Sequence, residues 1–261
     1  MHNLSVDNYK YLSWIHKFPD FNVDITTLPI HSSYSKFMES QKNNGNIDKI
    51  NKYLSYCLNV SNGKVQIFPY PDLLFNALNM TPLNKIKVVI LGQDPYHSIS
   101  EIPQAMGLSF SVPKGVEVPS SLKNIYNNMV KYNHIKKKPT HGNLTSLSYQ
   151  GVLLLNTTLT VQKGCPNGHL QKWHTFTDDL IKYISDNTNN VVFLLWGKPA
   201  YEKHTLIDES KHKIIVSSHP SGLSCSTKFR NFECFNNTDH FGNSNKYLEE
   251  HNKSAIIYEL I

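Results

Sequence analysis

Four short apolar runs, each ending in a small or polar residue, constrain the fold of this 261-residue chain more than any other feature. The runs are Lys87–Gly92, Gly151–Asn156, Val191–Gly197 and Lys213–His219. Their length and branched aliphatic side chains are typical of strands that are buried on both faces. Strands of this kind occur in parallel sheets that are covered by helices on either side.

Helical stretches lie between these runs. Ser121–Lys131 follows the first run, and Trp173–Ser185 follows the second. In the second stretch Phe176, Leu180 and Ile184 share one helical face. Strands that alternate with helices predict an α/β fold: a single domain with a central, mostly parallel four-stranded sheet flanked by helices on both sides.

The N-terminal part of the chain differs in character from the rest. Residues 1–64 mix aromatic and polar positions, and we predict a mainly helical segment that packs on a domain formed by residues 65–261. The stretch Gln41–Ile50, rich in Asn, Lys and Gly, is predicted as a loop between helices. Gln66–Pro71 is predicted to be rigid and extended because of its prolines, and Leu73–Leu78 has helical spacing.

Composition excludes several classes of protein. With 39% hydrophobic and 18% charged residues the chain is typical of soluble globular proteins. No apolar run approaches the roughly 18 residues of a membrane helix, and no signal or transit peptide pattern is visible. We therefore expect an intracellular protein of the nucleus or cytoplasm that is not secreted. The four cysteines contain no C-x-x-C pair, which argues against a metal site.

The net charge of +6 suggests a polyanionic partner. Of the 26 basic residues only Arg230 is an arginine. Arginine reads guanine edges with two hydrogen bonds, whereas lysine acts as a point charge that suits phosphates. If the partner is nucleic acid, this bias favours binding to the backbone over sequence readout. A codon preference for Lys, Asn and Ile explains the same bias equally well, so charge alone decides nothing.

Polar residues follow each predicted strand at its carboxyl end. They are Gln93–His97 after the first strand, Asn156 at the end of the second, Lys198 after the third and His219–Ser221 after the fourth. In open parallel sheets, ligands bind in the crevice beyond the carboxyl ends of the strands. We therefore expect these four segments to converge on one site.

The side chains at these ends indicate a chemistry. Asp94, His97, Asn156 and His219 bring together one carboxylate, two imidazoles and one amide. A carboxylate with a histidine suits a transition state that is cationic on one side and anionic on the other. The Asn156 amide, with an acceptor and donors, suits the edge of a nucleobase.

Each candidate also has a purely structural explanation. Asp94 can cap a turn, Asn156 can hold a loop, and the two histidines can be satisfied polar groups at strand ends. Tyr96 and Phe110 can provide a steric wall and a stacking surface, or can belong to the core. These patterns by themselves predict an α/β enzyme with a pocket for a small molecule or a base.

Two loops resemble those of a known family. Gly92–His97 is similar to the water-activating loop of the family 1 uracil-DNA glycosylases, and His219–Ser224 is similar to their minor-groove intercalation loop. Further segments occur between these loops in the family's order: Gly107–Val112, Pro119–Ile125, Gly151–Asn156, Leu159–Val161 and Leu194–Gly197. The resemblance runs from about residue 65 to the C-terminus and is weak over residues 1–64, which are therefore divergent.

The resemblance implies a role for each residue of the base pocket. It implies that Asp94 supports water attack at C1′ and the oxocarbenium-like sugar, and that His219 stabilises the departing uracil anion through O2. Asn156 would recognise N3–H and O4 of uracil. Phe110 would stack on the flipped base, and Tyr96 would exclude the 5-methyl group of thymine.

The resemblance assigns further residues to the water, the pocket wall and the duplex. Gln93 would line the pocket, His97 would order the water, and Leu223 would fill the space left by the flipped nucleotide. Chemistry on a base of duplex DNA requires extrusion, which costs a few kcal/mol and needs a phosphate grip, a wedge and a fitted pocket.

Serines supply the implied phosphate grip, namely Ser121, Ser221 and Ser224. Lys198 stands where a serine is common, and replaces a neutral phosphate contact by a charged one. The chain departs from the family at three further places: Gly222 replaces a proline and predicts a more flexible loop, the proline-rich loop is reduced to Val118–Ser121, and Ser98–Gln104 is longer than usual.

The sequence thus predicts a monomeric, monofunctional DNA repair glycosylase that releases uracil from single- and double-stranded DNA without metal or organic cofactor. The alternative is a DNA-binding subunit that keeps the glycosylase fold as a scaffold in a replication complex, with a replication or repair partner on residues 1–64. The presence of Asp94, Asn156 and His219 favours the enzyme. An α/β hydrolase with Ser109 or Ser221 as nucleophile lacks a G-x-S-x-G motif.

Overall fold

A four-stranded parallel sheet forms the centre of the protein, which we describe from a computed structural model of residues 4–260. Its strands are β2 (Val88–Gly92), β3 (Val152–Asn156), β5 (Val192–Trp196) and β6 (Lys213–Ser217), in the order β3-β2-β5-β6. The predicted fold class is confirmed, and each predicted strand differs from the observed one by at most two residues at an end.

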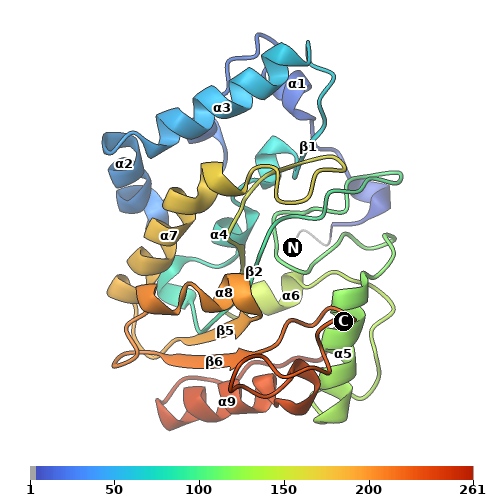
Figure 1. Ribbon diagram of the computed structural model, residues 1–261, viewed down its shortest axis with the longest axis vertical. Helices are drawn as coiled ribbons and strands as arrows, with labels where there is room; N and C mark the ends of the chain where they lie inside the picture. The colour runs from blue at the N-terminus through green and yellow to red at the C-terminus, as the bar shows by residue number, and fades with distance from the viewer. Residues whose placement is uncertain (1–3, 261) are drawn as a thin grey trace.

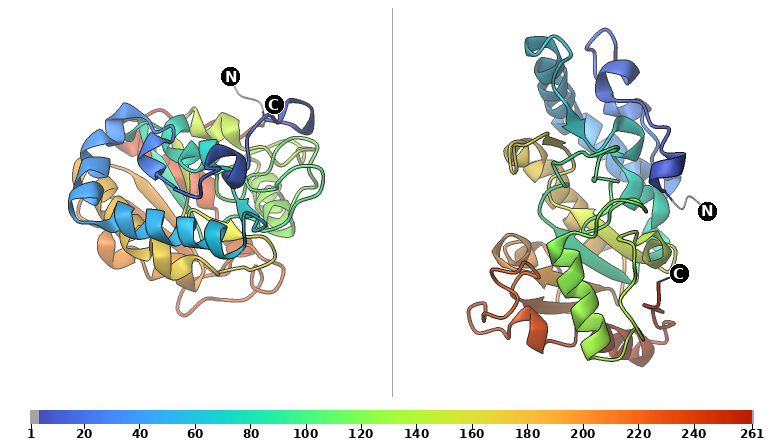
Figure 2. Two further views of the ribbon diagram at one scale, coloured as in Figure 1. Left: turned by 90° about the horizontal axis from the view of Figure 1, so that it is seen from above. Right: turned by 90° about the vertical axis from the view of Figure 1, so that its right-hand side faces the viewer.

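Burial explains why these runs form strands. Every residue of β2, β3 and β5 is buried, whereas the edge strand β6 begins with the exposed Lys213. A charged residue on an edge strand discourages pairing with another chain. In Figure 1 the arrows of the neighbouring parallel strands β5 and β6 point to the right, and the right-hand panel of Figure 2 views the molecule from that side.

Helices cover both faces of the sheet. In Figure 1, α7 and α8 lie above β5 and β6, α9 lies below them, and α5 stands beyond their right-hand ends. The helices are α1 (Trp14–Lys17), α2 (Ser35–Asn43), α3 (Asn46–Val60), α4 (Asn76–Met80), α5 (Ser120–Lys131), α6 (Thr145–Ser148), α7 (Leu170–Asn187), α8 (Lys198–Tyr201) and α9 (His240–Glu250). Short 3₁₀ turns are Val6–Asn8, Ile25–Thr27, Ser32–Tyr34, Pro71–Leu73, Leu83–Lys85, His204–Leu206 and Phe235–Asn237.

The N-terminal helices pack on the sheet domain. α2 and α3 lie across α7 at the top of Figure 1, where the Phe37 ring meets the Phe176 ring edge to face at 5.1 Å. Gln41 and Asn46 both donate to Asp179 Oδ2, at 2.9 and 3.3 Å. The buried residues of both helices and of the sheet belong to one hydrophobic cluster.

One prediction for this segment is wrong. Helices run through most of Gln41–Ile50, and only Asn44 and Gly45 lie between them. Gly45 adopts a left-handed φ of 76°, which lets the chain reverse within two residues. The stretch is helical because Ile47 and Ile50 are buried at helical spacing, while the polar residues that suggested a loop mostly face solvent.

A second, two-stranded sheet was not predicted. β1 (Ile67–Phe68) pairs antiparallel with β4 (Val161–Gln162), which immediately follows the β3 region. The extended character predicted for Gln66–Pro71 is thus confirmed in part as a strand. The predicted helical stretch Leu73–Leu78 divides into a 3₁₀ turn and the start of α4.

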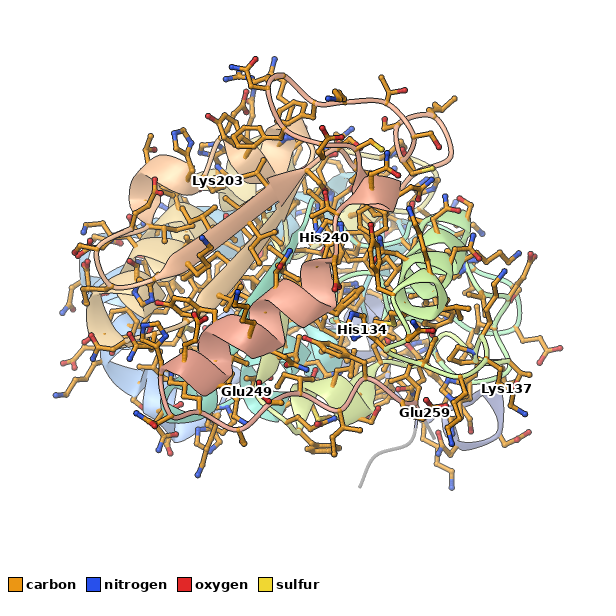
Figure 3. All side chains as sticks on the ribbon, turned by 90° about the horizontal axis from the view of Figure 1, so that it is seen from below. His134, Lys137, Lys203, His240, Glu249 and Glu259 are labelled. Atoms are coloured by element: carbon orange, nitrogen blue, oxygen red, sulfur yellow. The ribbon has the colours of Figure 1, made fainter. Side chains whose placement is uncertain are left out.

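A histidine network joins the lower helices to the end of β5. His134 Nε2 lies 2.6 Å from Asp239 Oδ1, just before the start of α9. Figure 3, a view from below, shows His134 and His240 near this end of α9. Burial lowers the pKa of His240 to about 3, so this ring is neutral. It accepts a hydrogen bond from Trp196 Nε1 at 3.2 Å, and its other nitrogen lies 3.2 Å from the Phe235 carbonyl. Trp196 is therefore fixed behind the strand ends.

Two classes of feature are absent from residues 4–260. None of the helices in this range is long and apolar enough to cross a membrane. The same residues contain no group of three side chains suited to hold a metal ion.

Candidate active site

A cavity of about 250 Å³ opens at the carboxyl ends of β2 and β3. It is smaller than the roughly 300–1,000 Å³ of pockets that take drug-sized ligands, and therefore suits a single small ring. Eight of the predicted site residues line it: Gln93, Asp94, Tyr96, His97, Phe110, Ser121, Asn156 and His219. Segments that are far apart in sequence thus come together, because the parallel strands that precede them end at the same edge of the sheet.

An open cleft of about 400 Å³ adjoins this cavity and shares Gln93 and His219 with it. The other four predicted site residues line the cleft, namely Lys198, Ser221, Leu223 and Ser224. The Leu223 side chain is 96% exposed. An apolar side chain so fully presented to water beside a cavity is a marker of a binding surface.

The base of the cavity depends on one pair of residues across the sheet. Gly92 ends β2 opposite Asn156, which ends β3. A Cβ atom on residue 92 would overlap Asn156 Oδ1 and would lie 2.8 Å from Ser109 Cβ. The Asn156 side chain is buried and forms no hydrogen bond within residues 4–260. Its amide is thus available to a ligand in the cavity.

Asp94 is held by a loop that comes from elsewhere in the chain. Its Oδ2 atom accepts the backbone N–H of Asn167 at 2.8 Å, so the carboxylate does not cap its own turn. The Asn167 side-chain oxygen accepts a hydrogen bond from Gln93 Nε2 at 2.6 Å. Sequence reasoning missed Asn167, for which the only signal is the turn-forming sequence Pro166-Asn-Gly168.

The His219 ring is a neutral donor. Its Nδ1 atom accepts the backbone N–H of Ser221 at 3.0 Å, which places the ring proton on Nε2. Burial lowers the pKa of His219, because the charged form loses its hydration. The ring therefore presents an N–H group rather than a positive charge at neutral pH.

Two aromatic residues shape the cavity wall. Phe110 has a left-handed φ of 62°, a rare conformation for a bulky residue that tends to occur at functional sites. Its ring lies 5.9 Å from the His219 ring and 5.5 Å from the Trp196 ring. The Tyr96 hydroxyl donates to the Phe110 carbonyl oxygen at 3.3 Å. Burial raises the pKa of Tyr96, so the hydroxyl keeps its proton and this bond.

The residues predicted to contact phosphates surround the cavity mouth. Ser121 lies in the first turn of the 12-residue helix α5, where the helix dipole and free N–H groups favour anions. Lys198 Nζ is exposed and lies 3.8 Å from Glu202 Oε1, a loose pair that leaves it accessible. Gly222 has open space where a Cβ would be, and its φ is not left-handed, so its backbone does not require glycine.

Comparison with known proteins agrees with this geometry. The family model described as "Uracil DNA glycosylase superfamily" matches residues 79–249. The chain belongs to this superfamily. A "Probable uracil-DNA glycosylase" of Acanthamoeba polyphaga mimivirus is 40% identical, over 98% of this chain and 72% of that protein. The "Uracil-DNA glycosylase" of Buchnera aphidicola is 49% identical, over 80% of this chain and 90% of that protein.

Solved structures extend the match to the fold of nearly all of this chain. The crystal structure of mimivirus uracil-DNA glycosylase superposes with a TM-score of 0.93 at 40% identity, and covers 98% of this chain and 97% of that one. The same mimivirus protein with a Y322F substitution, in complex with UGI, gives a TM-score of 0.94. The family resemblance, the fold class and the enzyme class predicted from the sequence are therefore confirmed.

The contact between Gly92 and Asn156 gives a test of the glycosylase pocket. Replacing Gly92 by Ala forces the Asn156 amide out of its position, so we expect uracil release to fall by about 10²-fold, the loss typical of a 1 Å displacement in an active site. Gly45→Ala is the control, because it strains a left-handed glycine that has no neighbours within 4 Å. Equal activity of the two variants would contradict the role assigned to this contact.

Proposed function

We propose that this protein removes uracil from DNA by hydrolysing its N-glycosidic bond, which leaves an abasic site. One observation carries the proposal: a carboxylate, a neutral imidazole donor, a free amide and an aromatic face surround a cavity that fits one small ring. Family membership and the names of the relatives support the same reaction. The role of each residue, as the resemblance implies it, is part of this proposal.

Asp94 acts on the sugar side of the bond. The Asn167 N–H donates to its Oδ2 atom, and we assign the other oxygen, Oδ1, to the reacting centre. A carboxylate there stabilises the positive charge that develops on the sugar, and orients the water that attacks C1′. His97 lines the same cavity and helps to order that water.

His219 acts on the base side of the bond. The departing uracil carries negative charge, which spreads to its O2 atom. The Nε2–H of the neutral His219 ring donates a hydrogen bond to this oxygen, in a buried environment where such a bond is strong. A neutral donor suits this role because it needs no counter-ion before the charge develops.

The cavity itself selects the base. The free Asn156 amide pairs with the N3–H and O4 of uracil, while the Phe110 ring stacks on its face and Gln93 lines the pocket. The Tyr96 ring, fixed by its bond to the Phe110 carbonyl, stands where thymine carries its methyl group. A rigid wall rejects an extra methyl more strongly than an apolar pocket that merely fits loosely.

The surrounding surface holds the DNA. Ser121, Ser221 and Ser224 donate to phosphates, and Lys198 adds a charged contact. Leu223, almost fully exposed, enters the duplex and fills the space of the flipped nucleotide. These contacts read the backbone rather than the sequence, so affinity falls steeply with salt.

The first experiment measures uracil release from a uracil-containing oligonucleotide in EDTA. Replacing Asp94 by Asn removes the charge but keeps the shape, and we expect release to slow by roughly 10²- to 10⁴-fold. Asp186→Asn, on the exposed face of α7, is the matched control. The proposed function is wrong if the wild-type protein releases no more uracil than Asp94→Asn does.

The second experiment tests the wall against thymine. Replacing Tyr96 by Ala opens space for a methyl group, so we expect measurable release of thymine from DNA alongside uracil. Tyr96→Phe keeps the ring and is expected to exclude thymine as the wild type does. An unchanged preference in Tyr96→Ala, measured by chromatography of the released bases, would refute the steric role.

A further inference from the structure

We infer that Asn167 is a positioning residue for the reaction, and that the loop Lys163–Gly168 between β4 and α7 exists to hold Asp94 and Gln93 in place. The inference rests on the proposed function, since it concerns the same cavity. Asn167 is not itself a catalytic residue, because it acts through the two side chains that it binds.

Three hydrogen bonds connect this loop to the segment Gly92–His97. The Asn167 N–H donates to Asp94 Oδ2 at 2.8 Å, and its side-chain oxygen accepts from Gln93 Nε2 at 2.6 Å. The Gly164 N–H donates to the His97 carbonyl oxygen at 3.1 Å. The loop therefore fixes both ends of the pocket segment, and a single residue of it holds two adjacent pocket side chains.

The backbone of Asn167 makes this double contact possible. Its φ is 64°, in the left-handed region that asparagine tolerates better than other residues with a side chain. The turn is closed by two further bonds, from Gly168 N–H to the Cys165 carbonyl and from Leu170 N–H to the Asn167 carbonyl, both at 3.1 Å. A β-branched residue at 167 cannot adopt this conformation without strain.

A buried network anchors the base of the loop. His169, next to the loop, lies with Nδ1 2.9 Å from Thr160 Oγ1, which also accepts the indole N–H of Trp173 at 2.6 Å. Burial lowers the pKa of His169 to about 4, so the ring is neutral and stays in this network. The Tyr53 ring of α3 packs edge to face on His169 at 5.0 Å. The N-terminal segment thus supports the loop that holds Asp94.

The arrangement explains how a half-exposed carboxylate keeps one orientation. Asp94 lines the cavity and is partly exposed, and free rotation would move its oxygens by more than an ångström. A fixed N–H donor on Oδ2 selects one rotamer and leaves the second oxygen free. Catalysis requires this kind of preorganisation in advance of substrate binding.

Two substitutions at position 167 separate the backbone contact from the side-chain contact. Asn167→Gly keeps the left-handed backbone and its N–H, but releases Gln93. We expect KM for a uracil-containing oligonucleotide to rise roughly two- to tenfold, the loss of one hydrogen bond, with little change in kcat. Asn167→Val displaces the N–H as well, and we expect kcat to fall about 10- to 100-fold.

Asn62→Val is the matched control. Asn62 also has a left-handed φ, 49°, but it is exposed in the turn after α3 and does not line the cavity. Its substitution imposes similar backbone strain, so it lowers the midpoint of thermal unfolding while kcat is kept. If Asn62→Val and Asn167→Val lower kcat equally, the effect at 167 is general destabilisation and the inference is wrong.

A double-mutant cycle gives the decisive result. If Asn167 acts through Asp94, then Asn167→Val has little further effect on kcat in protein that already carries Asp94→Asn. If Asn167→Val lowers kcat by the same factor in the wild-type protein and in Asp94→Asn, the inference is overturned. If Asn167→Val fails to fold, Asn167→Gly still tests the inference. The inference assigns kcat to the backbone contact with Asp94 and KM to the side-chain contact with Gln93, so a fall in kcat of Asn167→Gly without a rise in KM would contradict it.

A measurement without substrate distinguishes this inference from the proposed function. The backbone amide proton of Asn167 is hydrogen-bonded to Asp94, so its NMR signal is expected to shift in Asp94→Ala while that of Asn62 does not. Absence of the shift would contradict the positioning contact even if uracil is released. If the Asn167 signal shifts in Asp94→Ala but the wild-type protein releases no uracil, the proposed function is wrong while the positioning contact stands.

Discussion

The pairing of β2 with β3 is the constraint on which the rest of the site depends. It sets Gly92 opposite Asn156 at the last position of the two strands. Because residue 92 has no side chain, the Asn156 amide occupies the space beside it and forms the base of the cavity. A shift of one residue would turn Asn156 to the other face of the sheet and remove the amide from the cavity.

Burial of the sheet then sets the chemistry at its edge. The packed strands shield part of this edge from water, and a histidine that is largely buried there is more stable without its charge. His219 follows the edge strand β6, and its neutral state is a consequence of this placement. Asp94 lies at the same edge of the sheet, where it is partly exposed and its Oδ2 atom accepts the Asn167 N–H. One edge of the sheet thus provides both a neutral donor and a carboxylate.

The sequence was most informative where hydrophobic patterns decide the structure. Branched apolar runs predicted the strands closely, and the polar residues that follow them were brought together because parallel strands end on one side. It was misleading for Gln41–Ile50, because the abundance of Asn and Lys concealed two buried isoleucines at helical spacing. The role of Asn167 could hardly be predicted from the sequence, because its contact with Asp94 uses a backbone N–H that every non-proline residue has. Contacts of this kind depend on tertiary position and not on residue type.

We propose that the cavity is formed in advance for one flipped uracil. The most direct test is a crystal structure of the Asp94→Asn protein with a duplex that contains a single uracil. We predict that the uracil ring lies against Phe110 with the Asn156 amide within about 3.2 Å of its edge. Leu223 is then expected in the gap left in the duplex. A uracil that stays stacked in the helix, or that binds outside the cavity formed by Gln93–His97 and His219, would contradict the account.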